Sequence, residues 1–162
     1  MVRAYVSVGS NVDREAHVRA AVQTLKDQFG PLIVSPVYET GAVGFDGEPF
    51  LNLAVGLDTS RDPGQVVQDL KAIERERGRT ADSNGFKPRT LDLDLLLYGD
   101  LVLETGTFEL PRDEILHHAF VLGPLADIAP DLRHPVLGRT LAQLWSEFEL
   151  DGQWLRPVDL GL

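Results

Sequence analysis

Hydrophobic and polar residues alternate along four short stretches of the chain, and such alternation is typical of β-strands with one buried face. In the third stretch every second residue from Leu51 to Leu57 is apolar, while Phe50 and Asn52 point to the other side. The strands predicted in this way span residues 4–8, 32–40, 50–58 and 91–98.

Between these strands, apolar residues recur at the spacing of an α-helix. One helix is predicted over residues 13–29 and is ended by a Gly-Pro pair. The other begins at Asp62-Pro63, where Asp62 suits an N-cap and Pro63 suits the first helical position, and it ends before Gly78. The order is therefore strand, helix, strand, strand, helix, strand.

This order predicts an α+β fold with a ferredoxin-like βαββαβ antiparallel sheet and both helices on one face. The opposite face is predicted to be open and to carry a polar and aromatic set of residues. This set comprises Tyr5, Ser7, Phe50, Asn52, Asp92 and Asp94.

Weaker patterns follow the fourth strand. Residues 101–103 and 107–110 suggest an extra hairpin, residues 115–122 a helical turn, and an apolar stripe from Leu141 to Phe148 a last helix. The tail beyond Asp151 has no interpretable pattern. Since no internal repeat or linker is present, residues 1–162 are predicted to form a single domain.

Composition narrows the classes of function. With 162 residues and 43% hydrophobic content the chain suits one globular core, and a net charge of −10 argues against binding to nucleic acid or to an anionic membrane. The absence of cysteine excludes disulfides and thiolate metal sites. No leader-like or membrane-spanning stretch is recognisable, so we expect a cytoplasmic protein.

The strand from Leu91 to Tyr98 carries the most informative polar residues. Asp92 and Asp94 point to one side, with Cα atoms about 6.5–7 Å apart, and two ionised carboxylates need a positive partner. The pair can hold one or two Mg²⁺ ions, which in turn bind phosphate oxygens. Alternatively, the strand face is exposed and its aspartates pair with neighbouring arginines or lysines.

A basic loop precedes this strand. Arg79, Lys87 and Arg89 stand there against a single acid, Asp82. Either the loop is solvated and its arginines neutralise the aspartates, or arginines and metal together grip one polyphosphate. His117 and His118 are adjacent and would point about 100° apart in a helix, which disfavours a shared zinc ion.

With these pieces placed, the chain resembles the hydroxymethyldihydropterin pyrophosphokinases of folate biosynthesis from about residue 4 to about residue 135. The most specific carrier is the string Pro88-Arg89-Thr90-Leu91-Asp92-Leu93-Asp94. Further carriers are Gly9-Ser10-Asn11, Phe50-Leu51-Asn52, Glu74 with Gly78-Arg79, Phe120-Val121-Leu122, Pro124-Leu125 and Ile128-Ala129-Pro130.

The resemblance implies transfer of the β,γ-pyrophosphoryl group of ATP to the hydroxymethyl group of a reduced pterin, with release of AMP. The catalytic residues it implies are Arg79, Arg89, Asp92 and Asp94, of which the two aspartates would bind two Mg²⁺ ions. The nucleotide-binding residues it implies are Lys71, Glu74, Arg79, Arg89, Leu95, Arg112 and His118. The pterin-binding residues it implies are Thr40, Val43, Phe50, Asn52 and Phe120.

By this resemblance, the loops at 41–49 and 79–89 correspond to mobile lids of the family. We expect the chain to be a monomer whose partners are ATP and the reduced pterin. After Pro111 the chain departs from the family, because Arg112 stands where histidine is usual and His118 where arginine is usual. A diverged paralogue would explain this difference. Another Mg²⁺-dependent nucleotidyl or phosphoryl transferase and a ferredoxin-like small-molecule binding module remain alternatives.

Overall fold

A computed structural model describes residues 1–41, 47–78 and 91–162 of the chain. Its main feature is a six-stranded antiparallel sheet with the order β5-β1-β4-β3-β8, in which β2 also pairs with β4. These strands are β1 (Val2–Ser10), β2 (Ile33–Val34), β3 (Val37–Thr40), β4 (Phe50–Thr59), β5 (Asp92–Tyr98) and β8 (Leu155–Val158). The fold class is thus mixed α and β with an antiparallel sheet, as predicted.

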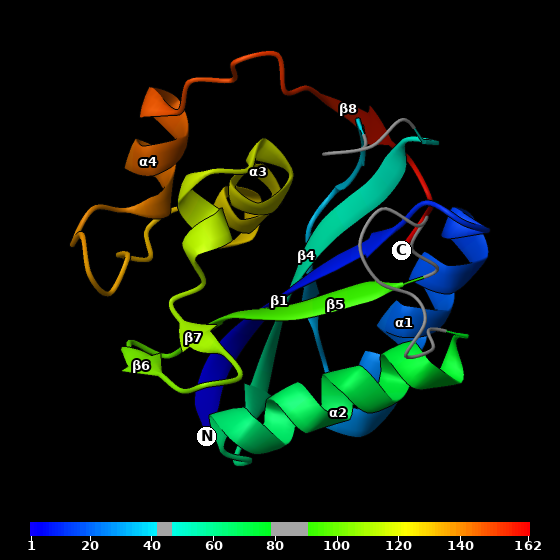
Figure 1. Ribbon diagram of the computed structural model, residues 1–162, viewed down its shortest axis with the longest axis horizontal. Helices are drawn as coiled ribbons and strands as arrows, with labels where there is room; N and C mark the ends of the chain where they lie inside the picture. The colour runs from blue at the N-terminus through cyan, green and yellow to red at the C-terminus, as the bar shows by residue number, and fades with distance from the viewer. Residues whose placement is uncertain (42–46, 79–90) are drawn as a thin grey trace.

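Helices cover both faces of the sheet (Figure 1). The helices α1 (Arg14–Phe29) and α2 (Pro63–Glu76) pack on one face over Val6, Val8 and the apolar side of β4. The helices α3 (Ala119–Ile128) and α4 (Leu141–Glu147) pack on the other, over Tyr5 and Ala54. The sequence predicted that second face to be open, and α3 instead buries its middle.

The start of α2 follows its predicted capping chemistry. The Asp62 side chain accepts a hydrogen bond from the Gln65 backbone N–H at 2.9 Å, and the Gln65 side chain accepts one from the Asp62 N–H at 3.0 Å. This reciprocal capping box satisfies two backbone donors that have no helical partner. It fixes where α2 begins, and with it the positions of Lys71 and Glu74 two and three turns later.

The alternation in β5 is interrupted. The pairing with β1 shifts register between Tyr5 and Val6, because β5 carries one extra residue there. Leu91, Leu93 and Leu95 therefore lie in the core under α1 and α2, whereas Leu96 and Leu97 lie under α3. Unbroken alternation over residues 91–98 predicts Leu97 on the same face as the other three leucines, and this prediction is wrong because a β-bulge changes which face the following residues occupy.

Two other elements differ from the prediction, and the expected hairpin is confirmed. The strand expected over 32–40 is divided at Ser35-Pro36, where the Ser35 hydroxyl accepts a hydrogen bond from the Ala54 N–H at 2.8 Å. The hairpin forms a separate two-stranded antiparallel sheet of β6 (Leu103–Glu104) and β7 (Glu109–Leu110). The expected helical turn over 115–122 is a 3₁₀ turn, η1 (Asp113–Leu116), followed by a break and then α3.

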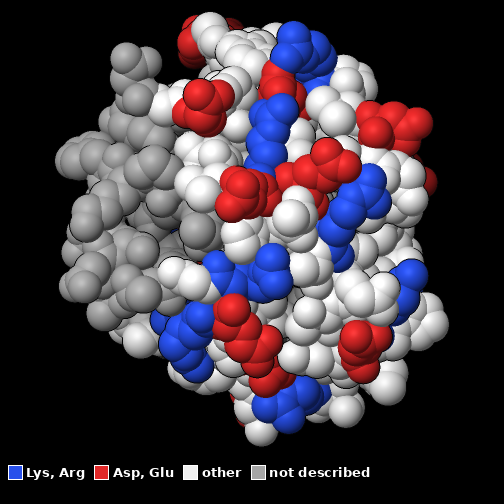
Figure 2. Space-filling model, turned by 90° about the vertical axis from the view of Figure 1, so that its right-hand side faces the viewer, with Lys and Arg blue, Asp and Glu red and all other residues white. Residues whose placement is uncertain are grey.

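The tail contributes β8, a strand that the sequence pattern did not reveal. On the face drawn in Figure 2, acidic and basic side chains of the described residues alternate and do not separate into one patch. No helix within the described ranges is long and apolar enough to cross a membrane.

Candidate active site

The pairing of three neighbouring strands brings the predicted site residues onto one face of the sheet. Gly9 on β1 lies opposite Asp92 on β5 and opposite Asn52 on β4. Directly opposed residues in antiparallel strands point to the same side, so Asp92 and Asn52 share a row with Gly9 between them. Neighbouring strands lie about 4.8 Å apart, which places the two side chains about 10 Å apart across the sheet.

Gly9 leaves room for the side chain of Asn52. A Cβ atom at this position would lie 2.6 Å from Oδ1 of Asn52, a distance that real Cβ contacts essentially never adopt. Asn52, which is 4% exposed, donates a hydrogen bond of 2.6 Å to the Thr40 hydroxyl. The glycine therefore allows Asn52 to lie where it can bond Thr40. The first strand was predicted to end at residue 8, so Gly9 was not recognised as a glycine inside a strand, which signals such a close approach.

The two aspartates open into a cavity of about 180 Å³ between α2, β5 and the segment around β7. This cavity brings together most of the residues predicted to bind nucleotide or metal. They are Lys71, Glu74, Asp92, Asp94, Leu95 and Arg112. Thr107 and Phe108 also line it, and no pattern in the sequence pointed to either residue as part of a site.

Glu74 joins α2 to β5 at this cavity. Its Oε2 atom accepts a hydrogen bond of 2.8 Å from the Leu93 backbone N–H. Because β5 lies at the edge of the sheet, this bond satisfies a donor that faces away from β1. Glu74 thereby holds β5 against α2 at Leu93, the residue between the two aspartates.

Arg112 is held by two carboxylates. Its guanidinium donates to Glu114 at 2.6 Å and 3.1 Å, and its Nη2 atom lies 3.7 Å from Oδ1 of Asp94. Burial lowers the pKa of Arg112, but Asp94 and Glu114 outweigh burial and raise it overall, so the side chain stays cationic. A fixed positive charge thus stands beside Asp94 at the mouth of the cavity.

The donor chemistry of the aspartate pair fits Mg²⁺. Two hard carboxylates on one edge strand, half-exposed and facing a polar cavity, match an ion that keeps several waters and shares its coordination with phosphate. Within the described ranges no cluster of three acidic, histidine or cysteine residues forms a complete protein cage. The phosphate oxygens of a substrate would supply the remaining ligands.

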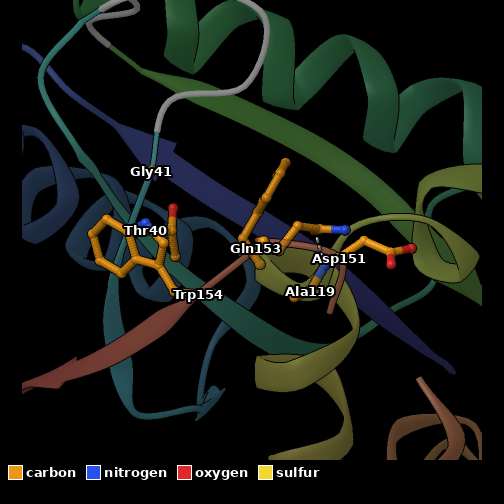
Figure 3. A pocket seen from close by; sticks show the side chains of 8 residues that line it. Thr40, Gly41, Ala119, Asp151, Gln153 and Trp154 are labelled. Atoms are coloured by element: carbon orange, nitrogen blue, oxygen red, sulfur yellow. Dashed lines mark hydrogen bonds between the residues drawn. The ribbon is translucent and has the colours of Figure 1, made fainter. Parts of the chain in front are cut away.

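A second cavity, of about 260 Å³, lies where the end of β3 meets the start of α3 and the C-terminal segment (Figure 3). Thr40 and Phe120, both predicted to bind pterin, line it, and Phe50 is paired with Thr40 on the same side of the sheet. Asp151, Gly152, Gln153 and Trp154 line it as well. These four residues were missed because the tail has no recognisable period.

His118 does not line the cavity that contains Asp92 and Asp94. It precedes α3, and its ring stacks on that of Phe120 with centroids 4.9 Å apart. Burial lowers its pKa below the ordinary 6.5, with Glu114 opposing the shift. Val43, Arg79 and Arg89 lie outside the described residues, as do most residues of the two expected lids.

Comparison with known proteins shows the family to which the chain is similar. Residues 5–130 match the family model described as 7,8-dihydro-6-hydroxymethylpterin-pyrophosphokinase (HPPK). The 2-amino-4-hydroxy-6-hydroxymethyldihydropteridine pyrophosphokinase of Pseudomonas aeruginosa is 40% identical over 157 residues, covering 93% of this chain and 94% of the relative. The enzyme of the same name from Bacillus subtilis is 40% identical over 129 residues, covering 77% of each.

The fold also matches solved structures. The crystal structure of wild-type Plasmodium falciparum HPPK-DHPS with pteroate superposes with a TM-score of 0.74 at 15% identity. That match covers 90% of this chain but only 42% of the Plasmodium chain, so the present chain spans less than half of that protein. Together with the sequence matches, this places the chain in the 7,8-dihydro-6-hydroxymethylpterin-pyrophosphokinase family, the ATP-dependent pyrophosphokinases that act on this dihydropterin in folate biosynthesis.

Proposed function

We propose that the cavity between α2 and the β5 edge holds ATP, and that the cavity between β3 and the start of α3 holds the reduced pterin. The chain then transfers the β,γ-pyrophosphoryl group of ATP to the hydroxymethyl group of 6-hydroxymethyl-7,8-dihydropterin and releases AMP. The observation that carries the proposal is the shared row of Asp92, Gly9 and Asn52. This row supports the proposal because a residue assigned to metal and phosphate and a residue assigned to the pterin lie about 10 Å apart on one rigid sheet.

In the nucleotide half, Asp92 and Asp94 hold Mg²⁺, two ions in this proposal, and Lys71 and Arg112 face the same cavity. The ions would supply charge neutralisation to the phosphate oxygens. Arg112 adds a permanent positive charge whose position is set by Glu114. Arg79 and Arg89 are assigned to the moving phosphates from the resemblance alone.

In the pterin half, Asn52 and Thr40 offer polar groups to the edge of the ring, and Phe120 and Phe50 offer aromatic faces to stack on it. Val43 is assigned to the same edge from the resemblance. Little covalent chemistry is required of the protein, because positioning and charge neutralisation dominate phosphoryl transfer.

We also infer a single domain that acts as a monomer. Both core clusters share the same sheet, which supports one cooperative unit. The strand order β5-β1-β4-β3, with α1 and α2 on one face, supports the ferredoxin-like arrangement, and α3, α4 and β8 are additions to it.

AMP formation tests the proposed function. We expect the purified protein with MgATP to release AMP only when the reduced pterin is present, in equal amount to the pyrophosphorylated pterin, as measured by anion-exchange chromatography. AMP release without pterin would favour another nucleotidyl or phosphoryl transferase. Pterin binding without any AMP formation would favour a binding module.

A pair of substitutions separates the two residues that depart from the family. Arg112→Ala should raise the KM for MgATP about tenfold at both pH 6 and pH 8, because a charge-assisted contact to phosphate is lost. The pKa of His118 is lowered by burial, so its ring is neutral at pH 8 and gains charge only as the pH falls below 6.5. His118→Ala should therefore leave the KM for MgATP unchanged at pH 8.

Arg19→Ala is the matched control for Arg112→Ala, since Arg19 also pairs with a glutamate but lies exposed on α1. Steady-state kinetics at the two pH values provide the measurement. An Arg112→Ala variant with the parental KM at both would show that this segment does not touch the nucleotide.

A further inference from the structure

The C-terminal segment lies outside the residues that match the family model, which end at 130, yet it lines the second cavity. Figure 3 shows Gln153 and Trp154 beside Thr40, Gly41 and Ala119 at this cavity. One wall of this cavity is therefore built from a part of the chain to which neither the family match nor the sequence pattern gives a role.

This segment is fixed to the sheet. Residues 155–158 form β8, which pairs with β3 so that Leu155 lies opposite Thr40. Glu39, which is 7% exposed, forms ion pairs with Arg156 from β8 and with Arg14 from α1. A buried carboxylate needs such partners, so the two arginines hold β8 in register.

Gln153 joins the segment to the start of α3. Its Oε1 atom accepts a hydrogen bond of 2.8 Å from the Ala119 N–H, and its Nε2 atom donates one of 3.1 Å to the His117 carbonyl. The Ala119 N–H belongs to the first turn of α3, where backbone donors have no helical partner. Because Phe120 is the next residue, Gln153 fixes the direction in which Phe120 leaves the backbone.

Trp154 presents an aromatic surface to the cavity. Its side chain packs against Gly41, where a Cβ atom would lie 3.1 Å from the indole Nε1 atom. The Arg156 guanidinium lies 5.9 Å from the centroid of its ring, a cation–π contact that restricts the indole. The residue nevertheless stays 42% exposed, so its ring remains accessible to a ligand in the cavity that it lines.

From these contacts we infer that residues 151–154 form a wall of the reduced-pterin pocket, with Trp154 contacting the pterin ring and Gln153 positioning Phe120 and Trp154. The inference rests on the proposed function, because it takes the occupant of this cavity to be the pterin. A flat bicyclic ring with polar edges suits a space that has two aromatic rings, a threonine hydroxyl and an amide around it.

Binding measurements with separate ligands test the inference. Trp154→Ala should weaken binding of 6-hydroxymethyl-7,8-dihydropterin about tenfold, the effect of losing one stacking partner. Its affinity for a non-hydrolysable MgATP analogue, titrated alone by calorimetry, should stay at the parental value. Trp145→Phe is the control, because Trp145 lies against Phe148 in the core cluster under α3 and α4.

The positioning role of Gln153 is tested with one variant that removes both of its hydrogen bonds and one that keeps the bond to the Ala119 N–H. Gln153→Ala should raise the KM for pterin several-fold with little change in kcat, since it acts through Phe120 and not on the reacting atoms. Gln153→Glu keeps the acceptor for the Ala119 N–H but loses the donor to the His117 carbonyl, so it should restore the parental KM only in part. Equal KM values for the parent and Gln153→Ala would overturn the positioning role.

Tryptophan fluorescence of the folded protein tests directly whether the pterin contacts Trp154. The chain has two tryptophans, so Trp145→Phe leaves Trp154 as the only one, and Trp154→Phe leaves Trp145. Pterin should protect Trp154 from quenching by acrylamide and should leave the accessibility of Trp145 unchanged.

The outcomes distinguish a failure of this inference from a failure of the proposed function. If the parent binds pterin and Trp154→Ala binds it equally well, or if pterin gives Trp154 no protection from acrylamide, residues 151–154 do not contact the pterin, while the proposed function stands. If the parent does not bind pterin at all, the proposed function fails and this inference fails with it.

Discussion

Replacing Asp92 or Asp94 by alanine should reduce the rate of pyrophosphoryl transfer by about 10³-fold or more, because the charge that holds metal and phosphate is lost. The fold should survive either change. Both side chains are half-exposed at the edge of the sheet, while Leu93 and Leu95 beside them keep the core intact. Single-turnover kinetics with the reduced pterin and MgATP provide the measurement.

Asp100→Ala is the matched control, since Asp100 is an exposed aspartate in the turn after β5 and lines neither cavity. Melting temperatures should hold or rise in the two site variants, because a like-charge neighbour is removed while Arg112 keeps its bond to Glu114. An alanine variant that unfolds more easily but keeps full activity in its folded fraction would assign the aspartates a structural role only.

Replacing Phe120 by alanine should weaken pterin binding by about 10- to 100-fold and leave the affinity for an MgATP analogue unchanged. The half-buried ring lies in the first turn of α3, stacks on His118 and lines the cavity that contains Thr40. Its loss removes an aromatic face from the pterin side of the site and no group from the phosphate side. Calorimetric titration with each ligand separately provides the measurement.

Phe148→Ala serves as the control, since Phe148 packs on the same core cluster but does not line this cavity. A Phe120→Leu variant should bind pterin with intermediate affinity, because it keeps apolar volume but loses the aromatic face. Equal loss of affinity for both ligands in Phe120→Ala would point to a general disturbance of α3 and would contradict a specific pterin contact.

The position of Gly9 explains how Asn52 can reach Thr40. Asp92 and Asn52 come from strands that are not neighbours, and Gly9 lies between them in the same row. A side chain at position 9 would clash with Asn52. The conformational freedom of glycine is not required here, and what matters is the missing side chain.

The positions of the local elements and the residues with the most specific chemistry could be predicted from the sequence. Alternation and helical spacing are properties of neighbouring residues, so β1, β4, α1, α2 and most of β5 lie within two residues of their predicted bounds. The same alternation put Asp92 and Asp94 on one side of a strand. The capping residues at Asp62 and Pro63 also act locally and were predicted from the chain alone.

How these elements combine depends on contacts between distant parts of the chain, which only the three-dimensional structure reveals. The bulge that turns Leu97 to the other face depends on pairing with β1, and the short β8 exists because β3 offers it an unpaired edge. The bonds from Glu74 to Leu93 and from Gln153 to Ala119 join residues 19 and 34 positions apart. Such contacts leave no period in the sequence, because a hydrogen bond between distant segments depends on where the whole chain places them and not on the residues next to either partner.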